Sequence, residues 1–147
     1  MTPQETALID ELLKKPCWVV DFLPYQVPNG SPGQFFAVEK YYLDKTRVSQ
    51  LRHKYVDILL KLNCYYDFSV CVAGGKPALK NPPPEAIGKL IMDTSHSSVI
   101  FVEPAHTMIT VYQDDLYMSV YNPTKELIAL ITTLSNASGL FFWEPEY

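Results

Sequence analysis

Apolar and polar positions alternate in the second half of the chain, over residues 98–122 (SVIFVEPAHTMITVYQDDLYMSVYN). Three strand-like segments follow one another within these 25 residues, so no helix fits between them. Parallel neighbours need a crossover connection of about a dozen residues or more, whereas antiparallel neighbours need only a short turn. The pattern therefore predicts an antiparallel meander, and with it a sheet that has an antiparallel core.

Four other segments have the periodicity or the end signals of helices. The clearest covers residues 45–62, and its apolar positions are Val48, Leu51, Tyr55, Ile58, Leu59 and Leu62. A helix over residues 3–15 begins at Thr2, which forms a capping box with Glu5. Shorter helices are expected over residues 84–92 and from the cap pair Asn122 and Pro123 to residue 135.

Segments rich in apolar and aromatic residues are predicted to be strands, at residues 17–23, 34–43, 67–73 and 140–144. The elements then follow the order α-β-β-α-β-α-β-β-β-α-β. Helices interspersed with an antiparallel meander indicate an α+β fold rather than a doubly wound parallel one. We expect a single domain over residues 1–147, with helices packed on a mixed or mainly antiparallel sheet.

The turn between the second and third meander strands determines which residues share a face of the sheet. If the loop around residues 113–115 contains an even number of residues, odd-numbered residues of the strand before it pair with even-numbered residues of the strand after it. One face is then wholly apolar and is predicted to be core, with Ile109, Val111, Leu116, Met118 and Val120. The other face carries Met108, Thr110, Tyr112, Tyr117, Ser119 and Tyr121. Its tyrosines, Tyr112, Tyr117 and Tyr121, predict a contact surface, unless the chain's own loops or terminus cover this face.

Charge limits the classes of partner. The chain has 12 basic and 16 acidic residues, and residues 93–147 carry one basic residue against seven acidic ones. This acidic third argues against nucleic-acid binding, for which a concentrated basic face is expected. No apolar run reaches the length of a membrane span and no signal peptide is visible, so we expect a cytoplasmic protein. The basic side chains of the helix over residues 45–62 are expected to face water; they are Lys45, Arg47, Arg52, Lys54 and Lys61.

No catalytic, metal or nucleotide signature stands out in the chain. The three cysteines, Cys17, Cys64 and Cys71, are expected to be buried and reduced, and their spacing does not match a zinc site. The pair Asp114 and Asp115 is explained by the turn that it occupies. Neither a metal nor a cofactor is therefore expected.

Two functions stay open at this point. The first is a small non-enzymatic module that binds a partner protein or a second copy of itself; its size and acidity are also compatible with a toxin-neutralising, immunity-like protein. The alternative is a small hydrolase or transferase whose site forms only in three dimensions around His96, the best general-base candidate, with Asp21, Asp67 and Tyr25. A cleft that holds a histidine near a carboxylate favours the enzyme, and an exposed aromatic face favours the binding module.

Overall fold

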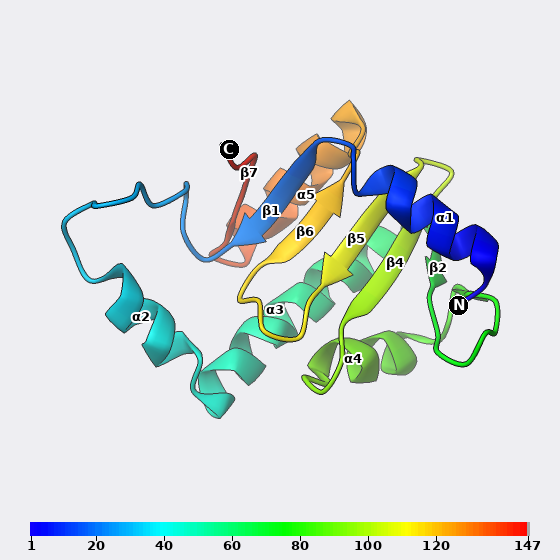
Figure 1. The fold of residues 1–147 in the computed structure, drawn as a ribbon, viewed down its shortest axis with the longest axis horizontal. Coiled ribbons are helices and arrows are strands. Elements are labelled where there is room, and N and C mark those ends of the chain that lie inside the picture. The colour runs from blue at the N-terminus through cyan, green and yellow to red at the C-terminus, as the bar shows by residue number, and fades with distance from the viewer. Residues whose placement is uncertain (147) are drawn as a thin grey trace.

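The computed structural model describes residues 1–146 and contains a seven-stranded sheet with helices packed on it (Figure 1). The strands are Cys17–Asp21 (β1), Asp67–Val70 (β2), Leu79–Lys80 (β3), Ser98–Glu103 (β4), Thr107–Val111 (β5), Met118–Tyr121 (β6) and Phe141–Trp143 (β7). They lie in the order β3-β2-β4-β5-β6-β1-β7, and all neighbours are antiparallel. The helices are Pro3–Leu12 (α1), Phe35–Tyr42 (α2), Lys45–Asn63 (α3), Pro84–Met92 (α4) and Lys125–Ala137 (α5). The predicted α+β class is confirmed.

One face of the sheet is covered by α3, α4 and α5 (Figure 1). The positions of α3 that were predicted to face the sheet, Leu51, Tyr55, Ile58 and Leu62, are at most 5% exposed. Asp44 caps this helix by accepting a hydrogen bond from the amide of Thr46 at 3.1 Å. Periodicity and cap therefore agree with the observed packing. None of the helices in residues 1–146 combines the length and the apolar character that crossing a membrane requires.

The meander β4–β5–β6 is antiparallel, and the β5–β6 pair has the predicted parity of odd beside even positions. Ile109 lies opposite Val120, and Thr110 lies opposite Ser119. The loop over residues 112–117 is even-numbered, as the prediction required. Ile109 and Val120 belong to the main core beneath α3, α4 and α5, which confirms the apolar face.

The opposite face is covered over only half its width. Leu12 of α1 packs against Met108 and Phe101, and Cys71 completes this smaller core. Met108 and Thr110 are at most 1% exposed, so the chain itself covers this part of the face that was predicted to be a contact surface. Tyr121 of β6 lies at the edge of this smaller core, and α1 does not extend over β1 and β7 on this side (Figure 1).

The predicted strand over residues 34–43 is wrong, because this segment forms α2. Aromatic residues favour strands in general, yet the spacing of Phe35, Glu39 and Tyr42 is that of one helix face. The ring of Tyr42 contacts that of Phe22, with centroids 4.8 Å apart, and α2 also packs against α3. The sequence contains this helical spacing, but the two aromatic pairs, Phe35-Phe36 and Tyr41-Tyr42, favour a strand.

Smaller differences concern the ends of elements. The N-cap of α5 is Thr124 rather than Asn122. Asn122 has a φ of 59°, and its side-chain amide donates to the His106 carbonyl at 3.0 Å. The predicted strand over residues 67–73 ends at Val70, and the two-residue strand β3, which pairs with it, is too short for a pattern to reveal. Only Cys71 is buried; Cys17 is half-buried and Cys64 is exposed, contrary to the prediction that all three cysteines are buried.

Candidate functional site

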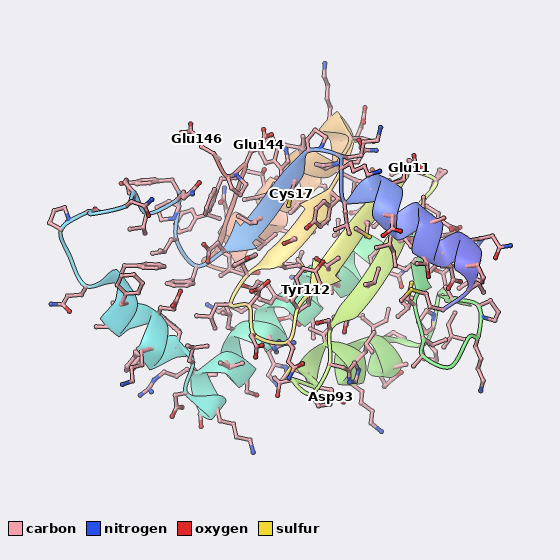
Figure 2. All side chains as sticks on the ribbon, viewed as in Figure 1. Glu11, Cys17, Asp93, Tyr112, Glu144 and Glu146 are labelled. Atoms are coloured by element: carbon pink, nitrogen blue, oxygen red, sulfur yellow. The ribbon has the colours of Figure 1, made fainter. Side chains whose placement is uncertain are left out.

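The uncovered half of the sheet forms the floor of a cleft with a volume of about 430 Å³. The register places Cys17 of β1 beside Tyr121 of β6, and it places Val19 between Ser119 and Trp143. Figure 2 shows Cys17 to the side of α1, on the part of the sheet that this helix does not cover. The floor is therefore built from three neighbouring strands that α1 leaves uncovered.

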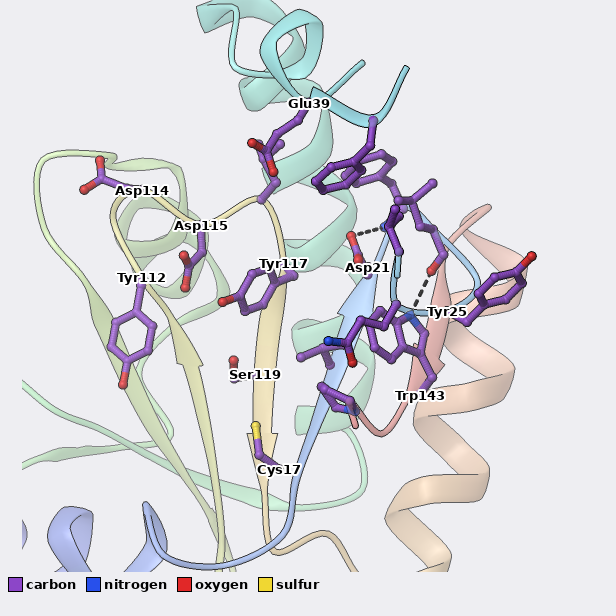
Figure 3. A pocket seen from close by; sticks show the side chains of 18 of the residues that line it. Cys17, Asp21, Tyr25, Glu39, Tyr112, Asp114, Asp115, Tyr117, Ser119 and Trp143 are labelled. Atoms are coloured by element: carbon purple, nitrogen blue, oxygen red, sulfur yellow. Dashed lines mark hydrogen bonds between the residues drawn. The ribbon is translucent and has the colours of Figure 1, made fainter. Parts of the chain in front are cut away.

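Three segments form the walls: residues 22–27, α2 with Leu43, and the β5–β6 loop (Figure 3). The indole Nε1–H of Trp143 donates to the Leu23 carbonyl at 2.8 Å and so ties the first wall to β7. The ring contact between Phe22 and Tyr42 ties the same wall to α2. Side chains distant in sequence are thereby held around one space.

The lining is both aromatic and acidic. Rings come from every wall and from the floor; they are Phe22, Tyr25, Phe35, Tyr112, Tyr117, Tyr121 and Trp143. Four carboxylates join them, from Asp21, Glu39, Asp114 and Asp115. No Lys, Arg or His side chain is among the described residues that line the cleft. The negative charge of this space therefore has no basic counterpart in its own walls.

Asp21 is the most perturbed of these carboxylates. Burial at the end of β1 raises its pKa from 3.8 to about 6, and the charge of Glu39 acts in the same direction. The amide of Phe22 donates to its Oδ1 at 2.7 Å, which offsets part of this rise. A lone carboxylate in an apolar strand was visible in the sequence, but its neighbour Glu39 was assigned to a strand instead of to the facing helix.

The β5–β6 loop contributes a second group of acidic side chains. Burial raises the pKa of Asp115, and the charge of Asp114 adds to this effect. A hydrogen bond with the Tyr117 side chain works in the opposite direction. In Figure 3 the ring of Tyr117 lies between Asp115 and Asp21, so aromatic and acidic groups alternate across the cleft.

At the bottom of the cleft, the Tyr121 hydroxyl is in hydrogen-bonding contact with Cys17 and Tyr112. Burial raises the pKa of Tyr121, and it also raises the pKa of the Cys17 thiol. A nucleophilic cysteine needs the opposite shift, toward the thiolate. These groups therefore serve as a neutral, polar floor at pH 7.

Arg52 of α3 binds the backbone of the β5–β6 loop on the side away from the cleft. It is 2% exposed, contrary to the prediction that the basic side chains of α3 face water. Its guanidinium donates to the carbonyls of Ile91, Tyr112 and Gln113 at 2.9, 3.1 and 3.2 Å. Arg52 falls within the apolar stripe of α3, and that position was the signal for its burial.

The residues proposed for an enzyme do not come together. His96 lies in the exposed loop after α4, where its Nδ1 is 3.5 Å from the Asp93 carboxylate; Figure 2 shows Asp93 beside α4, away from Cys17. Asp67 lies at the start of β2, where its carboxylate forms an ion pair with Lys80, with Nζ and Oδ2 3.7 Å apart. Only Asp21 and Tyr25, from that set, line the cleft.

The residues proposed for binding do come together. Tyr112, Tyr117 and Tyr121 all line the cleft, on the face that the alternation of the meander assigned to them. In residues 1–146 no group of three or more His, Cys, Asp or Glu side chains has the arrangement of a metal site. The arrangement is suited to non-covalent capture of a group that is flat, positively charged, or both.

Comparisons of the chain with protein-family models, with curated proteins and with solved structures find no match.

Proposed function

We propose that this protein is a small non-enzymatic binding module, and that the cleft over β6, β1 and β7 is its contact surface for a partner protein that carries positive charge. The observation that carries the proposal is the combination of seven aromatic rings with four carboxylates and no basic side chain in one lining. Tyrosine and tryptophan provide rigid contact area at low entropic cost, which is why they are enriched at interfaces. Carboxylates without a basic side chain in the same lining select a partner of opposite charge.

The mouth of the cleft supports a partner larger than a small molecule. Beside the lining residue Phe35, α2 exposes Phe36 by 81%, and the centroids of these two rings are 5.5 Å apart. Large exposed aromatics that adjoin a cleft are typical of protein contact surfaces. The partner therefore extends from the cleft over the outer side of α2.

The test starts from the two most exposed tyrosines of the lining, Tyr25 at 70% and Tyr117 at 38%. The double variant Tyr25→Ser/Tyr117→Ser should keep the wild-type circular dichroism spectrum. A partner that co-purifies with the wild type, once identified and purified, should bind this variant at least about tenfold more weakly, the effect of losing about 1.4 kcal/mol.

The matched control is Tyr65→Ser, since Tyr65 is 71% exposed and lies outside the cleft, after α3. It should bind the purified partner as the wild type does. Equal affinities for the wild type and for Tyr25→Ser/Tyr117→Ser would contradict the proposed contact surface.

A further inference from the structure

The cleft has a charge that its own walls leave uncompensated, and this property identifies the chemistry of its occupant. Asp21 of β1 and Glu39 of α2 line the same cleft from facing elements, and burial, with a smaller contribution from the Glu39 charge, raises the pKa of Asp21. Like charges in a partly buried site repel each other, and a cation bound between them relieves this repulsion. The rest of the lining consists of aromatic, aliphatic and uncharged polar side chains together with the carboxylates of Asp114 and Asp115, and the Phe22 amide donates to Asp21.

We propose that the cleft takes up the side chain of an arginine from the partner protein, with its guanidinium between Asp21 and Glu39 and its plane against the aromatic lining. This inference rests on the proposed function and specifies the group that is bound. In Figure 3 Glu39 lies above Asp21, the ring of Tyr117 lies beside Asp21, and Trp143 lies below them.

Arginine fits this lining better than lysine for three reasons. Its guanidinium is planar and stacks on aromatic faces, and it presents paired donors that match a carboxylate. It is more weakly hydrated than an ammonium group, so entering a half-buried cleft costs less. A cation over aromatic faces gains further attraction from the ring quadrupoles. Both kinds of acceptor, carboxylate and ring, are present in the lining.

A chain segment, rather than a free cation, is the source that the surroundings favour. On α2, Phe36 is 81% exposed and contacts the lining residue Phe35, with ring centroids 5.5 Å apart, and Leu43 is 51% exposed at the edge of the cleft. These side chains can contact the residues before and after the inserted arginine. A free cation would leave them in water.

The probe is a blocked heptapeptide, acetyl-Gly-Leu-Gly-Arg-Gly-Leu-Gly-amide, titrated into the ¹⁵N-labelled protein. The Trp143 indole N–H is the reporter, because Trp143 lines the cleft whereas Trp18 does not. Peptides with lysine or with the neutral isostere citrulline in place of arginine, and free butylguanidinium, are titrated in parallel. We expect the arginine peptide to bind most tightly, lysine more weakly, and citrulline at least about tenfold more weakly than arginine.

Variants Asp21→Asn and Glu39→Gln should each weaken binding of the arginine peptide at least about fivefold. Glu126→Gln, at an exposed position on α5, is the matched control and should leave the affinity unchanged. The inference is overturned by equal binding of the citrulline peptide, by wild-type affinity of Asp21→Asn and Glu39→Gln, or by butylguanidinium that binds as tightly as the arginine peptide.

The two proposals fail in different ways. If Tyr25→Ser/Tyr117→Ser loses the purified partner while Asp21→Asn and Glu39→Gln retain it, the contact surface stands and the arginine is wrong. If the tyrosine variant retains the partner, the contact surface itself is wrong.

Discussion

Replacing Asp21 with asparagine is expected to stabilise the fold at neutral pH. Burial raises the pKa of this carboxyl from 3.8 to about 6 in the folded protein. The folded state therefore binds the Asp21 proton more tightly than the unfolded state does. Stability from this group is fully present below pH 3.8 and is lost as the pH rises through about 6.

The magnitude follows from the same shift. Each pKa unit corresponds to about 1.4 kcal/mol, so a rise from 3.8 to about 6 costs the folded state about 3 kcal/mol at pH 8. Asparagine carries no charge, and its oxygen can still accept the hydrogen bond from the Phe22 amide. At pH 8, Asp21→Asn should therefore be more stable than the wild type by about 2–3 kcal/mol.

Urea unfolding followed by circular dichroism, at intervals between pH 4 and pH 8, measures this difference. The stability gain of Asp21→Asn should be near zero at pH 4 and should grow steadily until about pH 6. Asp57→Asn, at an exposed position of α3, is the control and should show no such trend. A difference between Asp21→Asn and wild type that is constant over the whole range would refute the reasoning.

Three further changes test the fold. Ile58→Ala, at a position 1% exposed, should lower the free energy of unfolding by about 2–5 kcal/mol, and an unchanged urea midpoint would rule out its place in the core. Arg52→Met should cost about 3 kcal/mol and speed amide exchange over residues 113–117, whereas exposed Lys54→Met should do neither. Glu5→Ala should cost about 1 kcal/mol, because Glu5 completes the α1 cap and accepts from the Ala78 amide at 2.6 Å; an unaltered thermal midpoint would contradict this.

Local pattern determined the parts of the fold that the sequence predicted correctly. α3 has a full apolar stripe and a capping aspartate, and both signals lie within the helix itself. The parity of the loop around Asp114 fixed both faces of the meander, whatever its precise turn. α2 was missed because its helical spacing covers just two turns, and paired aromatics suggest a strand over so short a stretch.

The cleft could be predicted only in part. The alternation of β5 and β6 assigned Tyr112, Tyr117 and Tyr121 to one face, and the structure places all three in the lining. Which part of that face stays open depends on where α1 packs, and no pattern within the meander encodes that. Glu39 lines the cleft with Asp21 because it lies on α2, where the sequence pattern predicts a strand.

The acidity of the cleft is a property of placement rather than of composition. The chain has 12 basic residues; of these, Arg52 lies behind the acidic loop, and Lys45 lines a neighbouring cavity together with Asp114 and Asp115. Its guanidinium donates to three backbone carbonyls, so it fixes the position of the loop without entering the space that Asp115 faces.

Ionised Asp21 lowers the free energy of unfolding, and the fold does not require a carboxylate at this position. A carboxylate that is destabilising when ionised, and that a neutral amide could replace in its hydrogen bond with Phe22, is typical of residues kept for a site rather than for stability. The same substitution, Asp21→Asn, should therefore raise stability at pH 8 and lower affinity for the arginine peptide. A variant that gained stability without losing affinity would separate these two effects and assign the raised pKa to packing at the end of β1 alone.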